Sequence, residues 1–229
     1  MDGAGTRLAH RTRPHARADG FLPLFTGPAG TRMKIAAAST IVAQGDRVSA
    51  IYRIVSGHVR CSIYTEDGHR RIVSFRGAGE VVGMSQMATG YWNASLKAVT
   101  ACVLEAVPVR VIADRIKTDP EVMQGALQTL QSEIDLQESH VLMMSILPAS
   151  ARVHAFLEAF AEERGSDGFV ALPMCRRDIG EYLGLSMETV SRSFTALRES
   201  HRIETLGSEK FRLLDHAGTG AAMGDRHAA

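Results

Sequence analysis

Cysteine is scarce in this 229-residue sequence, and long apolar runs are missing. The three cysteines, Cys61, Cys102 and Cys175, have neither the spacing of a metal site nor a pairing pattern for disulfides. Such usage is typical of a reducing cytoplasm. No run of about 18 or more apolar residues exists, so a membrane-spanning helix is not expected. The sequence predicts a cytoplasmic protein with no metal site and no membrane contact.

An excess of charge is also missing. Lys and Arg total 26 against 25 Asp and Glu, which gives a formal net charge of +1. Residues 150–229 even carry twelve acidic residues against ten basic ones, a formal −2. Binding of nucleic acid through bulk positive charge is therefore excluded, and any such binding must use a local patch.

Neither end of the chain has the pattern of a folded element. Residues 1–20 carry four arginines but lack the apolar core of a secretory signal. We predict a disordered tail over residues 1–25, although the composition also allows an organelle-type presequence. A second disordered tail is predicted over residues 217–229, which are rich in Gly and Ala.

Short β-rich runs between glycines occupy the first half, which predicts a sandwich or barrel over residues 26–117. The strands are expected from about Ile35 to Val111. The segment "EDGH", Glu66–His69, predicts a hairpin turn between two of them. In the run "VRCSIY" that precedes it, alternation points one set of side chains inward: Val59, Cys61 and Ile63.

The pattern changes at Asp119 and Pro120, which favour a helix start. Apolar positions then recur at alternating intervals of four and three residues, with one polar member. They are Met123, Leu127, Leu130, Ile134, Gln137, Val141 and Met144. This a/d pattern favours a partner helix. We predict a dimerisation helix over residues 118–147 in a homodimer; the alternative is a helix that lies on its own domain.

Residues 148–216 predict a winged helix–turn–helix. In "CRRDIGEYLGLSMETVSRSFTALRES", Gly184 supplies a turn between two amphipathic helices. The inward positions are Ile179, Leu183, Val190, Phe194 and Leu197. A hairpin that turns at Gly207 and Ser208 follows as the wing. The alternative is an ordinary helical hairpin with a solvated charged face.

The second helix of this motif has a separate outward face, formed by Glu188, Ser191, Arg192 and Thr195. Arg192 can donate two hydrogen bonds to guanine, and Glu188 can accept one from cytosine. The expected contacts with the DNA backbone are Arg176, Arg177, Ser186, Thr189 and Thr195. Ser186 can also cap the second helix.

The segment "RRDIGEYLGLSMETVSRSFTALRESHRI" resembles the helix–turn–helix of the CRP/FNR family, most closely its FNR/FixK branch. The resemblance covers roughly residues 30–215. It implies an α+β fold: an antiparallel β-roll of the cyclic-nucleotide-binding type, a long dimerisation helix and a C-terminal winged helix–turn–helix. It further implies a transcription regulator, most simply an activator, with RNA polymerase as partner. By analogy the biology is oxygen-limited respiration or nitrogen fixation.

The resemblance also implies which side chains read bases in double-stranded DNA: Met187, Glu188, Ser191 and Arg192. Met187 stands where the CRP branch has an arginine; it cannot hydrogen-bond guanine but can touch a thymine methyl group. The expected site is therefore a palindrome of the TTG-N8-CAA type rather than the CRP type.

The family's usual effectors are not expected. Relatives that bind cyclic nucleotides hold the ribose with a Gly-Glu pair and the phosphate with an Arg-Ser pair. Here Met84 stands at the Glu position, and Trp92 and Asn93 at the Arg-Ser positions. A buried phosphate without its arginine is poorly compensated, so we expect no cyclic nucleotide and read Met84 and Trp92 as core. Residues 1–40 contain no cysteine, which argues against an iron–sulfur cluster of the FNR type. We expect no cofactor.

Cys175 stands at the front of the first helix, beside Arg176 and Arg177. Positive charge and a helix N-terminus favour a thiolate, so we predict a redox-sensitive residue; the alternative is a small capping residue. No Ser/His/Asp set or carboxylate pair indicates an enzyme. Two other functions stay open: a regulator that senses an unidentified ligand in the roll, and a module that binds no DNA.

Overall fold

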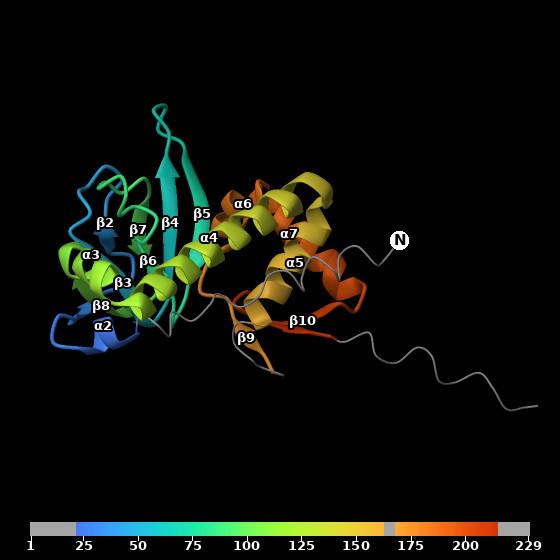
Figure 1. The fold of residues 1–229 in the computed structure, drawn as a ribbon. Helices are drawn as coiled ribbons and strands as arrows, with labels where there is room; N and C mark the ends of the chain where they lie inside the picture. The colour runs from blue at the N-terminus through green and yellow to red at the C-terminus, as the bar shows by residue number, and fades with distance from the viewer. Residues whose placement is uncertain (1–21, 163–167, 215–229) are drawn as a thin grey trace, which may run out of the picture.

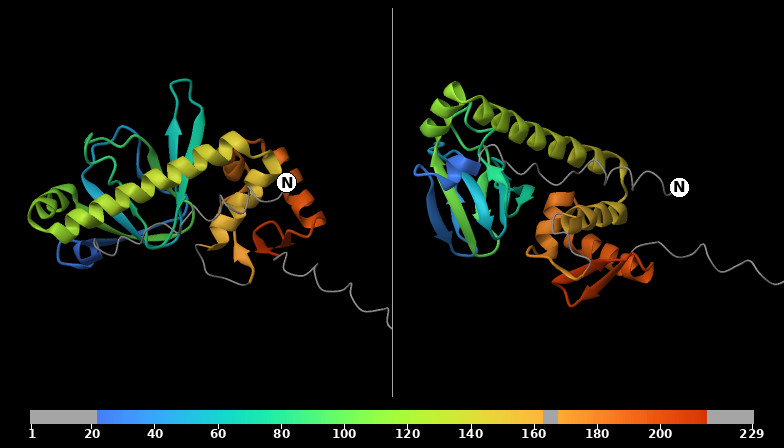
Figure 2. Two further views of the ribbon diagram at one scale, coloured as in Figure 1. Left: turned by 45° about the vertical axis from the view of Figure 1, so that its right-hand side comes forward. Right: turned by 60° about the horizontal axis from the view of Figure 1, so that its bottom comes forward.

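The computed structural model describes residues 22–162 and 168–214. A β-rich domain and a mainly helical domain lie side by side, joined by one long helix that runs along both (Figures 1 and 2). The predicted α+β order of roll, long helix and winged helix–turn–helix is confirmed. Most of the predicted N-terminal tail and all of residues 217–229 lie outside the described residues.

The boundary of the N-terminal tail is corrected by a short helix, α2 (Leu22–Thr26). Leu24 and Phe25 are buried in the core of the roll. The segment from Leu22 therefore belongs to the roll, because burial of the apolar Leu24 and Phe25 side chains stabilises it there.

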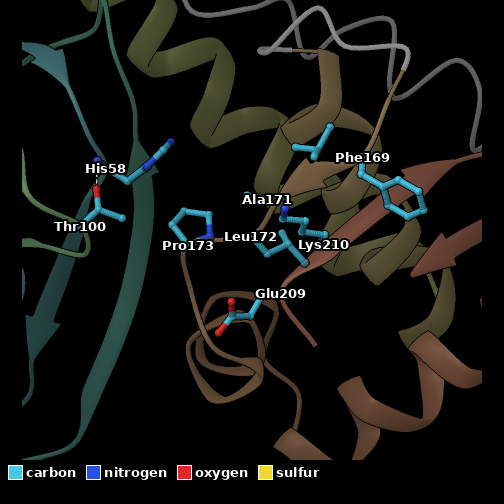
Figure 3. A pocket seen from close by; sticks show the side chains of 9 residues that line it. His58, Thr100, Phe169, Ala171, Leu172, Pro173, Glu209 and Lys210 are labelled. Atoms are coloured by element: carbon cyan, nitrogen blue, oxygen red, sulfur yellow. Dashed lines mark hydrogen bonds between the residues drawn. The ribbon is translucent and has the colours of Figure 1, made fainter. Parts of the chain in front are cut away.

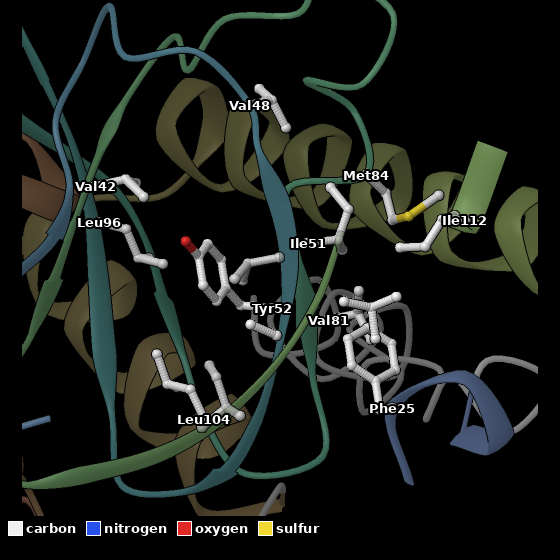
Figure 4. Close-up of a cluster of buried hydrophobic side chains, with 14 of the residues drawn as sticks. Phe25, Val42, Val48, Ile51, Tyr52, Val81, Met84, Leu96, Leu104 and Ile112 are labelled. Carbon is white, nitrogen blue, oxygen red and sulfur yellow. The ribbon is translucent and has the colours of Figure 1, made fainter. Parts of the chain in front are cut away.

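The roll consists of two four-stranded antiparallel sheets. One has the order β1 (Thr31–Ile35), β8 (Cys102–Pro108), β3 (Ala50–Ser56) and β6 (Val81–Val82). The other has the order β2 (Thr40–Val42), β7 (Ser95–Ala98), β4 (Val59–Tyr64) and β5 (Arg70–Arg76). Ile51, Leu96 and Leu104 are fully buried in the core that the two sheets enclose (Figure 4).

Strands β4 and β5 form the predicted hairpin, with Gly68 at a positive φ of 82° in the turn. The expected alternation along β4 is wrong beyond Cys61. A bulge shifts the register between Cys61 and Ser62, so that Ser62 is buried while Ile63 is half-buried. One extra residue in a ladder reverses which face each later side chain occupies.

A helix that the sequence analysis did not predict, α3 (Val109–Thr118), follows β8 directly. The expected strands therefore end at Pro108 rather than Val111. Next comes α4 (Pro120–Ile146), whose start was predicted correctly: the Asp119 carboxylate accepts hydrogen bonds from the backbone N–H groups of Glu121 and Val122. Among the helices of the described ranges, none has the length and apolarity to cross a bilayer.

The C-terminal domain begins with α5 (Ala149–Glu162) and contains the helices α6 (Arg176–Leu183) and α7 (Met187–Glu199). A three-stranded sheet with the order β10 (Ile203–Leu206), β11 (Lys210–Leu213) and β9 (Val170–Ala171) completes it. Its core includes Val153, Leu157 and Phe211. The β10–β11 hairpin is the predicted wing, and it turns at Gly207, where φ is 65°.

Candidate nucleic-acid interface

The turn between α6 and α7 has the backbone that its residues favour. Gly184 ends α6 in the left-handed conformation at φ 65°, ψ 35°. Gly180 lets the turn approach closely, since a Cβ there would lie 2.5 Å from the Leu185 carbonyl oxygen. The Ser186 hydroxyl caps α7 by accepting a hydrogen bond of 3.1 Å from the Thr189 N–H. These contacts fix the angle at which α7 leaves α6.

The two faces of α7 divide as predicted. Val190, Phe194 and Leu197 are buried against α5 and α6. The predicted base-reading residues Met187, Glu188, Ser191 and Arg192 are all exposed, as is Thr195. The helix therefore presents a mainly polar face to solvent, with Met187 as its one apolar member.

Two polar groups on this face have defined chemistry. The Ser191 hydroxyl donates to the Met187 carbonyl at 2.9 Å, so its oxygen remains available as an acceptor. A backbone N–H and then the Ser186 hydroxyl lower the pKa of Glu188, with smaller effects from Arg192 and Arg177. Glu188 is thus held as a carboxylate, which can only accept hydrogen bonds.

The expected backbone contacts differ in how available they are. The Arg176 guanidinium lies over the ring of Phe194, 3.2 Å from its centroid, and burial together with Arg198 lowers its pKa to about 10. Arg177 is exposed. Ser186 and Thr189 hydrogen-bond each other at 3.0 Å, so both hydroxyls already serve the cap. Of the two arginines, Arg177 is the better candidate for a phosphate contact.

Comparison with known proteins agrees with this geometry. The cyclic nucleotide-binding domain matches residues 32–119, and the Crp-like helix-turn-helix domain matches residues 151–218. The transcriptional activator protein FnrA of Stutzerimonas stutzeri is 31% identical over 189 residues, 81% of this chain and 77% of its own. The chain belongs to the CRP/FNR family of DNA-binding transcription regulators.

Two further CRP/FNR-family proteins point to the FixK-like branch. The nitrogen fixation regulation protein FixK of Bradyrhizobium diazoefficiens is 31% identical over 194 residues, 82% of this chain and 80% of its own. The structure of FixK2 from Bradyrhizobium japonicum superimposes with a TM-score of 0.75 at 26% identity, covering 81% of this chain and 93% of that one. The family and branch predicted from the helix–turn–helix are confirmed, and the family is one of regulators rather than enzymes.

In this CRP/FNR regulator, other residues stand at the positions where relatives hold a cyclic nucleotide. Met84 and Trp92 are both buried in the roll. Gly83, with a φ of 105°, lies so close that a Cβ there would be 2.7 Å from the Trp92 ring. Asn93 is exposed and accepts a hydrogen bond from Gln86 at 2.9 Å. Met84 and Trp92 thus occupy the core, as the sequence analysis expected.

The regulator also has an open cleft of about 540 Å³ between the roll and the wing (Figure 3). His58 and Thr100 line it on the roll side, where the Thr100 hydroxyl accepts a hydrogen bond of 3.0 Å from the backbone N–H of His58. Leu172, Glu209 and Lys210 line it on the side of the wing. No local sequence pattern predicts this cleft, because residues more than 100 positions apart form it.

Among the three cysteines, Cys175 is the exposed one. It is the N-cap residue of α6, and its thiol makes no capping hydrogen bond. Cys102 is buried and donates to the carbonyls of Thr100 and His58, and burial raises the pKa of its thiol. Burial also raises the pKa of the half-buried Cys61 thiol. An oxidant in solution therefore meets Cys175 first.

The predicted dimer seam lies on α4, on the face opposite the roll. Leu127, Ile134 and Val141 are 59%, 49% and 63% exposed, and Met123 and Gln137 are exposed beside them. The other two predicted members pack within the chain. Leu130 contacts the core of the roll, and Met144 lies against the turn at Gly184. The outward seam is thus narrower than predicted, but it is continuous and mostly apolar.

Proposed function

We propose that this regulator is a cytoplasmic transcription activator that binds a TTG-N8-CAA palindrome as a homodimer, without cyclic nucleotide. One observation carries the proposal: the exposed α7 face combines a guanidinium, a carboxylate and an apolar side chain within two helical turns. This is the chemistry required to distinguish base pairs in the major groove.

We name the exposed α7 residues Met187, Glu188, Ser191 and Arg192 the reading face. Their side chains match the chemical groups on base edges. Arg192 suits the O6 and N7 acceptors of guanine, and Glu188, held as a carboxylate, suits the amino group of cytosine. Met187, 44% exposed, suits the methyl group of thymine. Ser191 adds an acceptor between them. Together they read a TTG half-site, and Arg177 contacts the adjoining phosphate.

A homodimer supplies the second half-site. The exposed apolar stripe on α4 repeats at a/d spacing, which is the pattern that a parallel partner helix covers. Two-fold symmetry of the protein then requires a palindromic site. The relative FnrA is named a transcriptional activator and FixK a nitrogen fixation regulator, so we assign activation, through contact with RNA polymerase, to this chain as well.

The effector part of the proposal rests on the filled roll. Neither Met84 nor Trp92 can pair with a cyclic phosphate, and their burial leaves that anion without a counter-charge. DNA binding should therefore need no added nucleotide.

We further propose that peroxide inactivates the regulator through Cys175. Hydrogen peroxide transfers one oxygen to the Cys175 thiol, which gives a sulfenic acid and water, and a second equivalent gives the sulfinic acid and water, which ionises to the sulfinate. A fixed negative charge at the front of α6 would then repel the DNA phosphates. Cys175 is exposed, and its thiol makes no capping hydrogen bond to α6, which supports this step.

Selection of bound DNA from a random pool tests the proposal, with reduced protein in the presence and absence of cyclic AMP. We expect TTG and CAA half-sites separated by about eight base pairs, equally enriched in both arms. An enriched single half-site would contradict the dimer. Enrichment that appears only with cyclic AMP would contradict the effector assignment, and no enrichment would contradict the reading face.

A further inference from the structure

Two arginines of the β4–β5 hairpin hold two carboxylates on the first helix of the helix–turn–helix. Asp178 accepts hydrogen bonds from Arg60 at 2.6 Å and from Arg70 at 2.9 Å. Arg70 also donates two parallel hydrogen bonds to Glu181, both 2.7 Å long. We name these four residues the hairpin clamp. It joins strands of the roll to a helix more than 100 residues later in the chain.

The hairpin clamp is better placed to hold a geometry than a surface ion pair is. The Asp178 side chain is 8% exposed and that of Arg60 is 16% exposed. Exposed ion pairs contribute little because water and side-chain motion compete with them. The bidentate Arg70–Glu181 pair, with side chains 22% and 21% exposed, accepts few other geometries. Removing both arginines would leave the shielded Asp178 carboxylate without its partners.

An aromatic contact lies beside the hairpin clamp. Tyr182 packs edge-on against Phe75 of β5, with ring centroids 5.6 Å apart, and stacks on His140 of α4 at 4.4 Å. Helix α6 thus has two buried faces. Ile179 and Leu183 face the core of their own domain, while Asp178, Glu181 and Tyr182 face the hairpin and α4. Figure 1 shows α6 beside β5.

Holding α6 also fixes the direction of α7. The Leu185 N–H donates to the Gly180 carbonyl at 2.8 Å, and the cap at Ser186 starts α7 directly after this turn. The turn therefore transmits the orientation of α6 to the reading face. In a dimer joined through α4, that orientation sets the distance between the two reading faces.

We propose that Arg60 and Arg70 are positioning residues that set the spacer length of the palindrome. By locking each helix–turn–helix to its own roll, they hold the two copies of α7 at one separation, so that half-sites at other separations are rejected. The proposal rests on the palindrome and homodimer of the proposed function. It assigns the specificity for spacing to residues that touch no DNA.

Binding to a series of palindromes with spacers of about six to ten base pairs tests this role. Wild-type protein should prefer one spacer by about tenfold or more. The double variant Arg60→Ala, Arg70→Ala should discriminate less than about threefold, because its reading faces can reorient. Its preference for TTG within each half-site should remain. Arg71→Ala, at the exposed neighbouring arginine, is the matched control and should keep the wild-type profile.

Small-angle X-ray scattering of the DNA-free proteins gives a second readout that does not depend on the palindrome. The double variant should have a larger radius of gyration than wild type. A separate variant with the charges exchanged, Arg70→Glu with Glu181→Arg, keeps an ion pair at this position and should therefore be more compact than the double variant. A wild-type spacer profile or wild-type scattering in the double variant would overturn the clamp. Wild-type protein that prefers no spacer would contradict the proposed dimer site instead, and scattering would still decide the clamp.

Discussion

Arginines of the DNA-binding domain divide between packing inside the domain and facing solvent. Arg176, at the start of α6, covers Phe194 and is half-buried, whereas Arg192, on α7, is exposed. Both are basic residues on helices of the same motif, and residue type alone does not show which one is buried. Burial decides the difference: a guanidinium stacked on an aromatic ring gives up much of its reach to solvent.

Replacing Arg192 should alter specificity rather than binding in general. Arg192→Ala should lose about 1–3 kcal/mol of discrimination at the guanine of each half-site, because a bidentate contact reads that base. Arg177→Ala is the comparison, since loss of a phosphate contact should weaken all sequences by a similar factor. Affinities for a full set of single-base variants of the palindrome measure both. Uniform weakening by Arg192→Ala would show that Arg192 reads no base.

Replacing Cys175 should separate oxidation from other damage. Cys175→Ser should bind DNA like wild type and keep binding after peroxide, because a hydroxyl is not oxidised under those conditions. Cys175→Asp, which carries the negative charge permanently, should bind at least about tenfold more weakly without any oxidant. Band-shift titrations before and after peroxide treatment measure both effects.

Two results would contradict the role of Cys175. If Cys175→Asp binds like wild type, the N-cap of α6 is too far from phosphate for a charge to matter. If Cys175→Ser loses binding at the wild-type rate, the oxidised group lies elsewhere. Cys61→Ala is the control, since its half-buried thiol should contribute nothing to the sensitivity.

At the scale of elements, α4 serves two surfaces at once. Val122, Ala126 and Thr129 are buried, while the a/d residues Leu127, Ile134 and Val141 are exposed. A contiguous apolar stripe that a helix leaves in water marks a surface for a partner. The exposed part of this stripe is therefore where we expect a second copy to bind.

Charges placed on that stripe should give monomers. Ile134→Asp with Val141→Asp should abolish dimerisation, since two buried carboxylates would lack partners. Leu130 is avoided because it also packs on the roll. Gln124→Asp with Gln128→Asp, at exposed positions of the same helix, is the control and should remain dimeric. Sedimentation measures the mass; an intact Ile134→Asp, Val141→Asp dimer would mean that another surface joins the chains.

The elements also show what sequence patterns can and cannot predict. Asp119 and Pro120 marked the start of α4, and Gly184 marked the turn of the helix–turn–helix, because capping and positive φ restrict the residue types at those positions. The five residues of α2 are too few for a periodicity. The β-branched residues at the start of α3, Val109 and Val111, favoured a strand.

The candidate site divides in the same way. The outward face of α7 follows from helical spacing within one segment, so the exposure of the four residues proposed to read bases could be predicted. Contacts between domains have no local signal. Nothing near Asp178 in the sequence indicates that Arg60, 118 positions earlier, is its partner. The bulge in β4 was missed for a related reason, since register depends on the neighbouring strand.

At the scale of the whole molecule, the roll, the helix–turn–helix and α4 are in mutual contact. The roll holds α6 through the hairpin clamp, α6 directs α7, and α4 runs past both domains (Figure 2). An open cleft lies between the roll and the wing. A change in any of these contacts alters where the reading face points, even though the reading residues themselves stay the same.

The hairpin clamp also changes the electric field that DNA meets. Residues 150–229 have a formal charge of −2 by themselves, which would repel phosphates at long range. Arg60 and Arg70 bring two positive charges to Asp178 and Glu181. Residues 150–229 together with these two arginines are therefore formally neutral. Counterions released from the duplex can then favour association without first overcoming that repulsion. The electrostatic balance of the DNA-binding domain is therefore completed by a strand pair that belongs to the roll.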